Sequence, residues 1–184
     1  MKLVVVQNSD KDLRDYMAIH YSKPEGFVGR NICYAIMHDD YLYGFIVSGS
    51  ATKFLPGRDE FLGISASRNL NRIINNTFFH VERLDGKYPY RNFVSSIMEG
   101  WEQVAPLHWK RKYGDIVIAL ETLVELPRTG EVYRRCGWNE IGITRGFTCK
   151  RVAGQGTDSW GGKRVWNIHD LKPKLVLMKK VLVV

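Results

Sequence analysis

The stretch of residues 31–50, NICYAIMHDDYLYGFIVSGS, limits the possible folds of this chain more than any other. It reads as two strands joined at the adjacent acids Asp39 and Asp40, which suit a tight hairpin turn. Apolar side chains occupy both faces of these strands, and a sheet of that kind needs cover on both sides. We therefore expect an α/β (α+β) fold with a central sheet that has helices on both faces.

Two helices are expected around this hairpin from the spacing of apolar residues. Residues 91–113 have apolar side chains at helical spacing, and Pro106 is expected to split that helix or kink it. A shorter helix is expected over residues 8–20, with Ser9 as its N-terminal cap. Both follow a strand-like stretch, so the order of elements alternates as in mixed α/β domains.

The expected strand over residues 72–82 contains a polar pair, Asn75-Asn76. Two adjacent amides in a buried strand need partners, so the pair predicts a bulge or a groove there. The remaining expected elements are a strand over residues 2–7, a strand over 115–126, a short helix over 128–138 capped by Thr129, a strand over 139–151, a glycine-rich loop and a last strand over 174–184.

The net charge of +8 is concentrated at one end of the chain. Residues 145–184 contain 9 Lys and Arg against 2 Asp and Glu, so they hold +7 of that charge. A nearly neutral body with one basic segment indicates a polyanion-binding face, or a basic surface that only aids solubility. With 184 residues the chain is expected to form a single domain.

The spacing of cysteines and histidines bears on compartment and metal binding. Cys33, Cys136 and Cys149 are odd in number and widely spaced, which fits neither a disulfide framework nor a CxxC zinc site. No apolar run is long enough for a membrane span, and the first one is too short for a signal peptide. We expect a cytoplasmic protein. No HxxxH pair occurs, so a metal such as iron has no support from spacing.

A candidate active site begins in residues 19–31, IHYSKPEGFVGRN, which glycines and a proline make a poor helix and a poor strand. His20 stands where the first helix ends, and Tyr21 follows it. A neutral histidine can accept a proton near pH 7, and Tyr21 can orient a substrate or stack on it. The alternative is that His20 only satisfies the last carbonyls of its helix.

Two further candidates fall in elements of the expected core. Glu121 interrupts an apolar strand, and a buried carboxylate there is either paired to an arginine or available as an acid or base. Ser95 begins the central helix, where it either caps or lines that helix or donates to a substrate carbonyl.

The segment GEVYRRCGWNEIG, residues 130–142, and the order of elements both resemble the GNAT acyltransferase superfamily. In many members a tyrosine four residues before a Gly-aromatic pair protonates the leaving thiolate of the acyl donor, and Tyr133 precedes Gly137-Trp138 at that spacing. The resemblance implies a GNAT-like, mostly antiparallel sheet and a catalytic Tyr133. The alternative is that Tyr133 merely packs beneath the sheet.

One motif of that superfamily is absent. Its donor pyrophosphate is usually held by an Arg/Gln-x-x-Gly-x-Gly/Ala turn that opens the central helix. The same place here reads YPYRNFVSSIMEG, without the paired glycines. Arg91 and Asn92 remain candidates to bind a phosphate or nucleotide of the donor. The activated acyl donor is therefore expected to be either acetyl-CoA-like or a glycyl-tRNA.

Four longer segments are similar to the Mom family of phage DNA-modification proteins: HYSKPEGFVGRNICYAI, INNTFFHVERLDG, LETLVELPRTGEVYRRCGW and CKRVAGQGTDSWGGKRVW. Those proteins convert adenine in DNA to N6-carbamoylmethyladenine, which shields phage DNA from host restriction. The resemblance implies the same activity here, with double-stranded DNA as partner, a flipped adenine as acceptor and tRNA as a candidate donor.

That reaction gives expected roles to residues near the C-terminus. Asp158 would pair with His20, act as a base or receive a glycyl ammonium, and an Asx turn is its alternative role. In the basic loop, residues 150–166, Trp160 would stack on an extruded base or replace it, unless it only covers the edge of the core. The cations expected to bind DNA phosphates are Lys150, Arg151, Lys163 and Arg164.

Two other functions remain open at this point. A GNAT N-acetyltransferase that acts on a protein or a small amine explains the GEVYRRCGW segment but not the basic loop. A non-catalytic nucleic-acid-binding module explains the charge but leaves His20 and Tyr133 without a role. The sequence predicts no oligomeric state.

Overall fold

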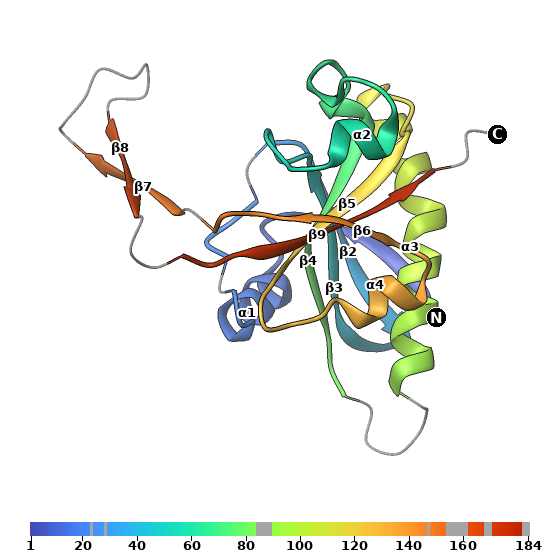
Figure 1. The fold of residues 1–184 in the computed structure, drawn as a ribbon. Coiled ribbons are helices and arrows are strands. Elements are labelled where there is room, and N and C mark those ends of the chain that lie inside the picture. Colours follow the sequence, from blue (N-terminus) through green and yellow to red (C-terminus); the bar gives the residue numbers. More distant parts are fainter. Residues whose placement is uncertain are drawn as a thin grey trace.

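The computed structural model describes residues 1–22, 24–27, 29–83, 90–146, 148–153, 162–167 and 171–181. Seven strands form one sheet in the order β1-β2-β3-β4-β5-β9-β6, and β7 and β8 form a separate hairpin that stands apart from the sheet (Figure 1). Neighbouring strands of the sheet are antiparallel except β4 and β5, which are parallel. The expected mixed, mostly antiparallel sheet is confirmed.

The elements have the following bounds. The strands are β1 (Lys2–Val6), β2 (Asn31–His38), β3 (Tyr41–Ser50), β4 (Ile73–Val81), β5 (Ala119–Glu125), β6 (Asn139–Ile143), β7 (Thr148–Ala153), β8 (Gly162–Asn167) and β9 (Lys174–Lys180). The helices are α1 (Lys11–Ile19), α2 (Arg58–Leu62), α3 (Tyr90–Tyr113) and α4 (Glu131–Arg135), with 3-10 turns at Ala66–Arg68 and Leu70–Arg72.

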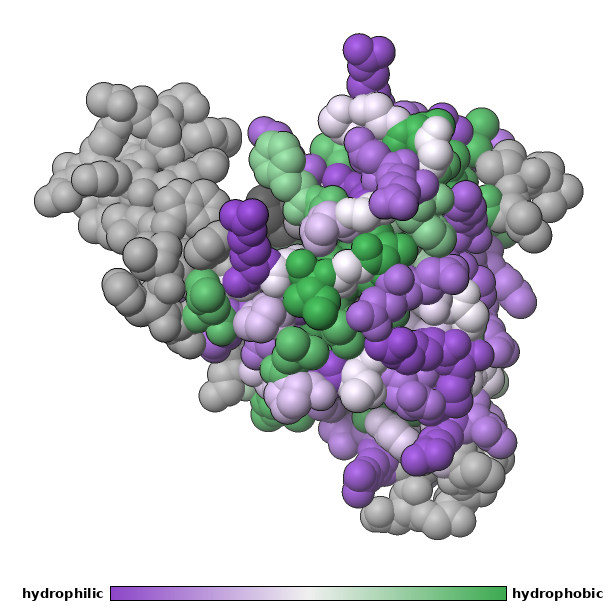
Figure 2. Space-filling view, viewed as in Figure 1, coloured by the Kyte–Doolittle hydropathy of each residue, from purple (hydrophilic) through white to green (hydrophobic). Residues whose placement is uncertain are grey.

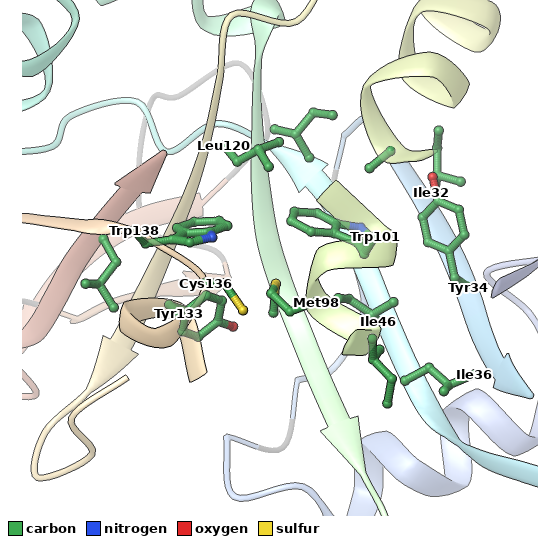
Figure 3. Close-up of a cluster of buried hydrophobic side chains, with 14 of the residues drawn as sticks. Ile32, Tyr34, Ile36, Ile46, Met98, Trp101, Leu120, Tyr133, Cys136 and Trp138 are labelled. Atoms are coloured by element: carbon green, nitrogen blue, oxygen red, sulfur yellow. The ribbon is translucent and has the colours of Figure 1, made fainter. Parts of the chain in front are cut away.

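Helices cover both faces of the sheet, as the apolar faces of residues 31–50 predict (Figure 1). α3 and α4 cover one face, where Met98 and Trp101 of α3 belong to one buried cluster with Ile46 of β3 (Figure 3). α1 covers the other face, where Leu13 is fully buried in a second cluster with Phe45. The space-filling view shows hydrophobic surface near the centre of the body and hydrophilic surface around it (Figure 2).

The turn between β2 and β3 forms at the predicted acids. Asp39 and Asp40 have φ angles of 47° and 65°, which is the left-handed backbone that a two-residue hairpin turn requires. The hairpin is therefore confirmed together with its turn.

The long helix α3 is continuous through Pro106, so the predicted split does not occur. The apolar stripe continues past the proline, because Trp101, Ala105 and Trp109 are all fully buried. A proline inside a helix removes one backbone hydrogen bond and clashes with the preceding turn, which costs about 3 kcal/mol. Burial of apolar side chains on both sides of Pro106 offsets this cost. No helix within the described residues is both long and apolar enough to cross a lipid bilayer.

Both predicted helix caps are displaced by one residue. Asp10, not Ser9, caps α1 by accepting the Leu13 N–H at 3.0 Å. Gly130, not Thr129, precedes α4 and has a left-handed φ of 67°, a conformation that threonine adopts only with strain. At each helix start two adjacent residues are able to cap, and the pattern of residues does not decide between them.

The C-terminal third differs from the expected order. The predicted strand over residues 139–151 is two strands, β6 in the main sheet and β7 in the hairpin. The predicted glycine-rich loop contains a strand, because residues 162–167 pair with residues 148–153 as β8. The sequence does not predict this strand, because two glycines precede Lys163 and glycine normally weakens strands.

Candidate active site

A gap opens between the parallel strands β4 and β5. They pair over three residues only, Ile73–Asn75 with Ala119–Glu121, and then β4 continues beside β3 while β5 continues beside β9. At the point of divergence Thr122 donates from Oγ1 to the Asn76 carbonyl at 3.0 Å. The Asn75-Asn76 pair predicts a bulge or a groove, and the register of β3 with β4 shifts next to this pair, which confirms the bulge.

A pocket of about 260 Å³ fills this gap. It is lined by both strands, by the end of α1 and by α4 with the loop before it. The lining residues that carry polar or aromatic groups are His20, Tyr21, Ser22, Asn76, Thr77, Phe78, Phe79, Thr122, Glu125, Arg128, Tyr133 and Lys174. Three residues of the expected site, His20, Tyr21 and Tyr133, are therefore brought together, although Tyr133 lies more than a hundred positions from the other two.

His20 is held at the C-terminus of α1. Its backbone N–H donates to the Tyr16 carbonyl at 3.0 Å, and its side chain is only 6% exposed. The imidazole Nδ1 lies 2.8 Å from Ser22 Oγ and accepts the Ser22 backbone N–H at 3.3 Å. An Nδ1 that accepts this N–H carries no proton, so the neutral ring holds its hydrogen on Nε2.

The electrostatic surroundings of His20 make it a weak base. Its pKa is lowered from 6.5 to about 4, chiefly by burial; nearby His80 and Arg128 also lower the pKa, and a hydrogen bond with the Phe79 backbone opposes them. The ring also contacts Phe78, with the two centroids 4.6 Å apart. His20 is consequently neutral throughout the physiological range.

Tyr21 and Arg128 stack on one another at the pocket. The Arg128 guanidinium carbon lies 3.4 Å from the centroid of the Tyr21 ring, within the range of a cation–π contact. Burial raises the pKa of Tyr21, and the Arg128 charge opposes that rise. Tyr21 is 46% exposed, so its ring forms part of the pocket's accessible wall.

Tyr133 faces the gap from α4. Its hydroxyl donates to Asn76 Oδ1 at 2.6 Å, and its ring lies edge-on to Trp138 with centroids 5.0 Å apart (Figure 3). Burial raises the pKa of Tyr133, so the phenol stays protonated, and its one hydrogen is the one donated to Asn76. The residue thus packs beneath the sheet and lines the pocket at the same time.

Glu121 lies outside this lining. Its Oε2 accepts from Arg58 Nη1 at 3.0 Å and its Oε1 from the Thr52 N–H at 2.7 Å. Both side chains are buried, at 0% exposed for Glu121 and 3% for Arg58. Of the two roles open to it in the sequence, the structure places Glu121 in the arginine pair.

Ser95, Arg91 and Asn92 belong to the first turns of α3 and are also outside the lining. Arg135 of α4 donates from Nε to Ser95 Oγ at 3.2 Å and from Nη2 to the Arg91 carbonyl at 3.4 Å. Two cations, Arg91 and Arg135, are therefore near the start of the long helix, where backbone N–H groups and the helix dipole favour a donor phosphate.

The predicted DNA-binding residues are placed only in part. Lys150 and Arg151 lie in β7, and Lys163 and Arg164 lie in β8, with Arg151 opposite Arg164 in the register. Asp158 and Trp160 lie outside the described residues. Among the described residues there is no group of three or more His, Cys, Asp or Glu side chains that could hold a metal ion.

Several lining residues were missed from the sequence. The sequence identifies Asn76 as a polar interruption of an apolar strand, but not as the hydrogen-bond partner of Tyr133. Glu125 is the one carboxylate among the described lining residues, and Ser22, Arg128 and Lys174 complete the polar wall. The sequence could have predicted Glu125 as a candidate, because residues 121, 123 and 125 are spaced by two and so lie on one face of the expected strand with Glu121.

No protein-family model matches the chain, and no curated protein matches it significantly, so the resemblance to the Mom family gains no support from these comparisons. Solved structures do match. A Bacillus subtilis acetyltransferase in complex with CoA is 13% identical with a TM-score of 0.55, covering 98% of this chain and 100% of that one. An Enterococcus faecium aminoglycoside 6'-N-acetyltransferase is 12% identical with a TM-score of 0.55, covering 98% and 97%.

A GNAT family acetyltransferase from Elizabethkingia anophelis, with acetyl-CoA bound, is 7% identical with a TM-score of 0.53. The match covers 98% of this chain and 97% of the Elizabethkingia anophelis chain. At these identities the likeness establishes the fold, and the fold is that of the GNAT acetyltransferases, as the order of elements predicted.

Proposed function

We propose that this protein transfers an activated acyl group to the N6 amine of adenine in DNA, and that N6-carbamoylmethyladenine is the final product. The observation that carries the proposal is the pocket between β4 and β5, where a neutral His20 and a protonated Tyr133 line one cavity. The fold supports acyl transfer, and the similarity of four segments to the Mom family supports DNA adenine as the acceptor.

The depressed pKa of His20 suits a nucleobase amine better than an alkyl amine. The N6 lone pair is delocalised into the purine ring, so this amine enters the pocket unprotonated and becomes strongly acidic once it has attacked a carbonyl. His20, with a pKa of about 4, can accept that proton at Nδ1 once the ring gives up its hydrogen bonds with Ser22. An alkyl amine with a pKa of about 10 arrives as an ammonium ion and needs a stronger base first.

In this reaction Tyr133 acts on the leaving group. Its hydroxyl, which donates to Asn76 Oδ1 at 2.6 Å in the structure, turns to the donor and stabilises the negative charge that develops when the carbonyl–donor bond breaks. Full proton transfer to a thiolate is uphill, because a thiol has a pKa of about 8.5 and the pKa of Tyr133 is raised. An alkoxide leaving group, such as the ribose oxygen of an aminoacyl ester, is basic enough to take the proton.

The donor is therefore proposed to be a glycyl ester such as glycyl-tRNA, with an acetyl-CoA-like thioester as the second possibility. One of the similar structures contains CoA and another contains acetyl-CoA, which supports a thioester. Arg91 and Arg135 at the start of α3 would hold a phosphate of either donor. The raised pKa of Tyr133 favours the ester.

A glycyl group accounts for the product by atom balance. N6 attacks the ester carbonyl, the donor hydroxyl leaves with a proton, and adenine carries a glycyl amide. The free glycyl amine then attacks ring carbon 6 through a five-membered transition state, and the bond from carbon 6 to the amide nitrogen breaks. One proton moves from the attacking nitrogen to the departing amide, which gives the isomeric carbamoylmethyl group.

A second candidate function is N-acetylation of an alkyl amine on a small molecule or a protein. Glu125 favours it, because a carboxylate in the pocket wall can hold an ammonium group and help to deprotonate it. An aminoglycoside acetyltransferase with the same fold also supports it.

Nucleoside mass spectrometry of DNA from cells that express the protein tests the proposal. A new deoxyadenosine derivative heavier by one glycyl residue is expected, and it is expected to fall strongly with the Tyr133→Phe variant. Unmodified DNA together with acetylated amines or proteins would overturn the proposal in favour of the second function. Purified protein supplied with glycyl-tRNA or with acetyl-CoA then identifies the donor.

A further inference from the structure

A groove with a volume of about 930 Å³ lies beside the pocket between β4 and β5. It is lined by residues 52–60, which lead into α2, by residues 143–146 after β6 and by Lys172 and Lys174 before β9. Leu123 and Lys174 line both the groove and the pocket. The groove and the pocket that contains His20 are therefore neighbours.

The groove has an excess of positive charge. Lys53, Arg145 and Lys172 are exposed in its wall, and Lys174 is partly buried between groove and pocket. In the part of the chain that the structure describes, none of these four cations takes part in an ion pair. Two acids, Asp59 and Glu60, also line the groove, so a net positive charge remains and favours a polyanion.

An aromatic ring lies among these cations. Phe54 is 80% exposed, and the Lys53 ammonium lies 5.4 Å from the centroid of its ring. An exposed phenylalanine gains nothing from folding, because its apolar surface stays in water. Alternation of cations with an accessible aromatic ring is the arrangement by which proteins bind single-stranded nucleic acid, with phosphates on the cations and a base stacked on the ring.

The segment that holds Lys53 and Phe54 is fixed from beneath by the buried Arg58–Glu121 pair. Arg58 Nη1 donates to the Thr52 carbonyl at 2.6 Å and Nη2 to the Lys53 carbonyl at 3.1 Å. Glu121 accepts the Thr52 N–H at 2.7 Å. The buried charges therefore hold this loop in one conformation before a ligand arrives, which lowers the entropy cost of binding.

The opposite wall is fixed by backbone hydrogen bonds at the base of the β7–β8 hairpin. The Thr144 N–H donates to the Lys174 carbonyl at 2.9 Å, and the Lys172 N–H donates to the Gly146 carbonyl at 3.0 Å. A side chain at residue 146 would clash with Lys172, since a Cβ there would lie 2.4 Å from its carbonyl carbon. Along the chain, residues 143–146 of this wall are followed by β7, which pairs with β8.

We propose that this groove binds the single strand beside the target nucleotide, with Phe54 stacked on the neighbouring base and with Lys53, Arg145 and Lys172 at its phosphates. The inference rests on the proposed function for the identity of the target, and it defines how the acceptor reaches the pocket. A base can stack on Phe54 only when it has left the duplex, so the groove selects unpaired nucleotides.

The test is a binding measurement that needs no chemistry. A fluorescein-labelled single-stranded oligodeoxynucleotide of about 12 residues is titrated with protein at salt concentrations from about 50 to 200 mM. The variants are Phe54→Ala and Lys53→Gln/Arg145→Gln. The matched controls are Tyr41→Ala, an exposed ring at the β2–β3 turn, and Lys110→Gln/Arg111→Gln at the end of α3.

Loss of the ring is expected to weaken binding about 5- to 150-fold without a change in salt dependence. Loss of the two cations is expected to reduce the slope of log K against log salt by about 1.4, since each phosphate contact contributes about 0.7 in a single strand. Both control variants are expected to bind like wild type. Groove variants that bind like the controls overturn the inference, as does equal loss for Phe54→Ala and Tyr41→Ala.

Assays of DNA modification and competition by poly-L-glutamate, added to the binding data, separate this inference from the proposed function. Binding that depends on the groove, in a protein that leaves DNA unmodified, supports the groove and refutes the DNA-modification proposal. If the groove variants modify DNA and their affinity and KM equal those of wild type, the proposed function is supported and the groove proposal is refuted. Equal competition by poly-L-glutamate, with no effect of Phe54→Ala, indicates a general polyanion surface and also refutes it.

Discussion

Replacement of Arg58 by methionine tests whether the buried ion pair holds the groove loop. The substitution removes three hydrogen bonds, to Glu121 Oε2 and to the Thr52 and Lys53 carbonyls, and leaves a carboxylate that is 0% exposed without its cation. Breaking a buried pair in this way costs about 3–5 kcal/mol of the free energy of unfolding. For a domain of this size that corresponds to a fall in Tm of about 6–20 °C.

The loss depends on pH in a direction that follows from Glu121. Burial raises the pKa of this carboxyl, and the Arg58 charge opposes the rise. Without Arg58 the folded protein binds a proton that the unfolded chain releases, so stability increases as pH falls through the folded pKa. Arg58→Met is therefore expected to be most destabilised near pH 8 and less so near pH 5, as measured by urea unfolding at both values.

Two further variants make the result specific. Arg58→Met/Glu121→Gln removes the buried charge but keeps an acceptor for the Thr52 N–H, and it is expected to recover stability to within about 1–2 kcal/mol of wild type. Arg68→Met, at an exposed arginine, is expected to change stability by less than about 0.5 kcal/mol. A single Arg58→Met variant as stable as Arg68→Met at pH 8 would refute the argument.

Three other changes have definite expected outcomes. Tyr133→Phe removes the hydroxyl that stabilises the leaving group, so kcat is expected to fall about 10²–10³-fold. It also leaves Asn76 Oδ1 without its donor, so the free energy of unfolding is expected to fall by about 1–3 kcal/mol. Unchanged kcat in a stopped-flow or single-turnover assay contradicts the role in leaving-group stabilisation. The kcat/KM profile is expected to decline only below about pH 4–5, because the pKa of His20 is lowered to about 4, and a limb near pH 6.5 that is lost in His20→Gln shows that its ring titrates normally. Gly57→Ala is expected to lower Tm, because φ there is +73° and a Cβ would lie 2.1 Å from the Ile141 carbonyl oxygen; calorimetry that shows an unchanged Tm contradicts the strain argument.

Local patterns predicted the parts of the fold that depend on neighbours in the chain. The apolar faces of residues 31–50 required helices on both sides of the sheet, and both are present. The Asn75-Asn76 pair predicted a bulge or a groove because buried amides need partners, and one partner is the Tyr133 hydroxyl. His20 was placed at a helix end because the next residues exclude a helix, and it is the C-terminal cap of α1.

Features that depend on long-range pairing were not predictable in the same way. The β7–β8 hairpin joins strands across a glycine-rich stretch, and nothing in the local pattern specifies that register. The stack of Tyr21 on Arg128 joins residues more than a hundred positions apart. The Arg58–Glu121 pair joins strand β5 to a short helix whose sequence has no clear periodicity. Each of these contacts forms only once the sheet has brought its segments together.

The central claim is that the pocket between β4 and β5 modifies adenine in DNA with a glycine-derived group. Cells that express the protein are grown with isotopically labelled glycine, and the nucleosides of their DNA are analysed by mass spectrometry. The account predicts a carbamoylmethyl deoxyadenosine that contains the label in wild type and that is nearly absent in Tyr133→Phe. A DNA pool without any labelled deoxyadenosine derivative, from cells in which the folded wild-type protein is abundant, would contradict it.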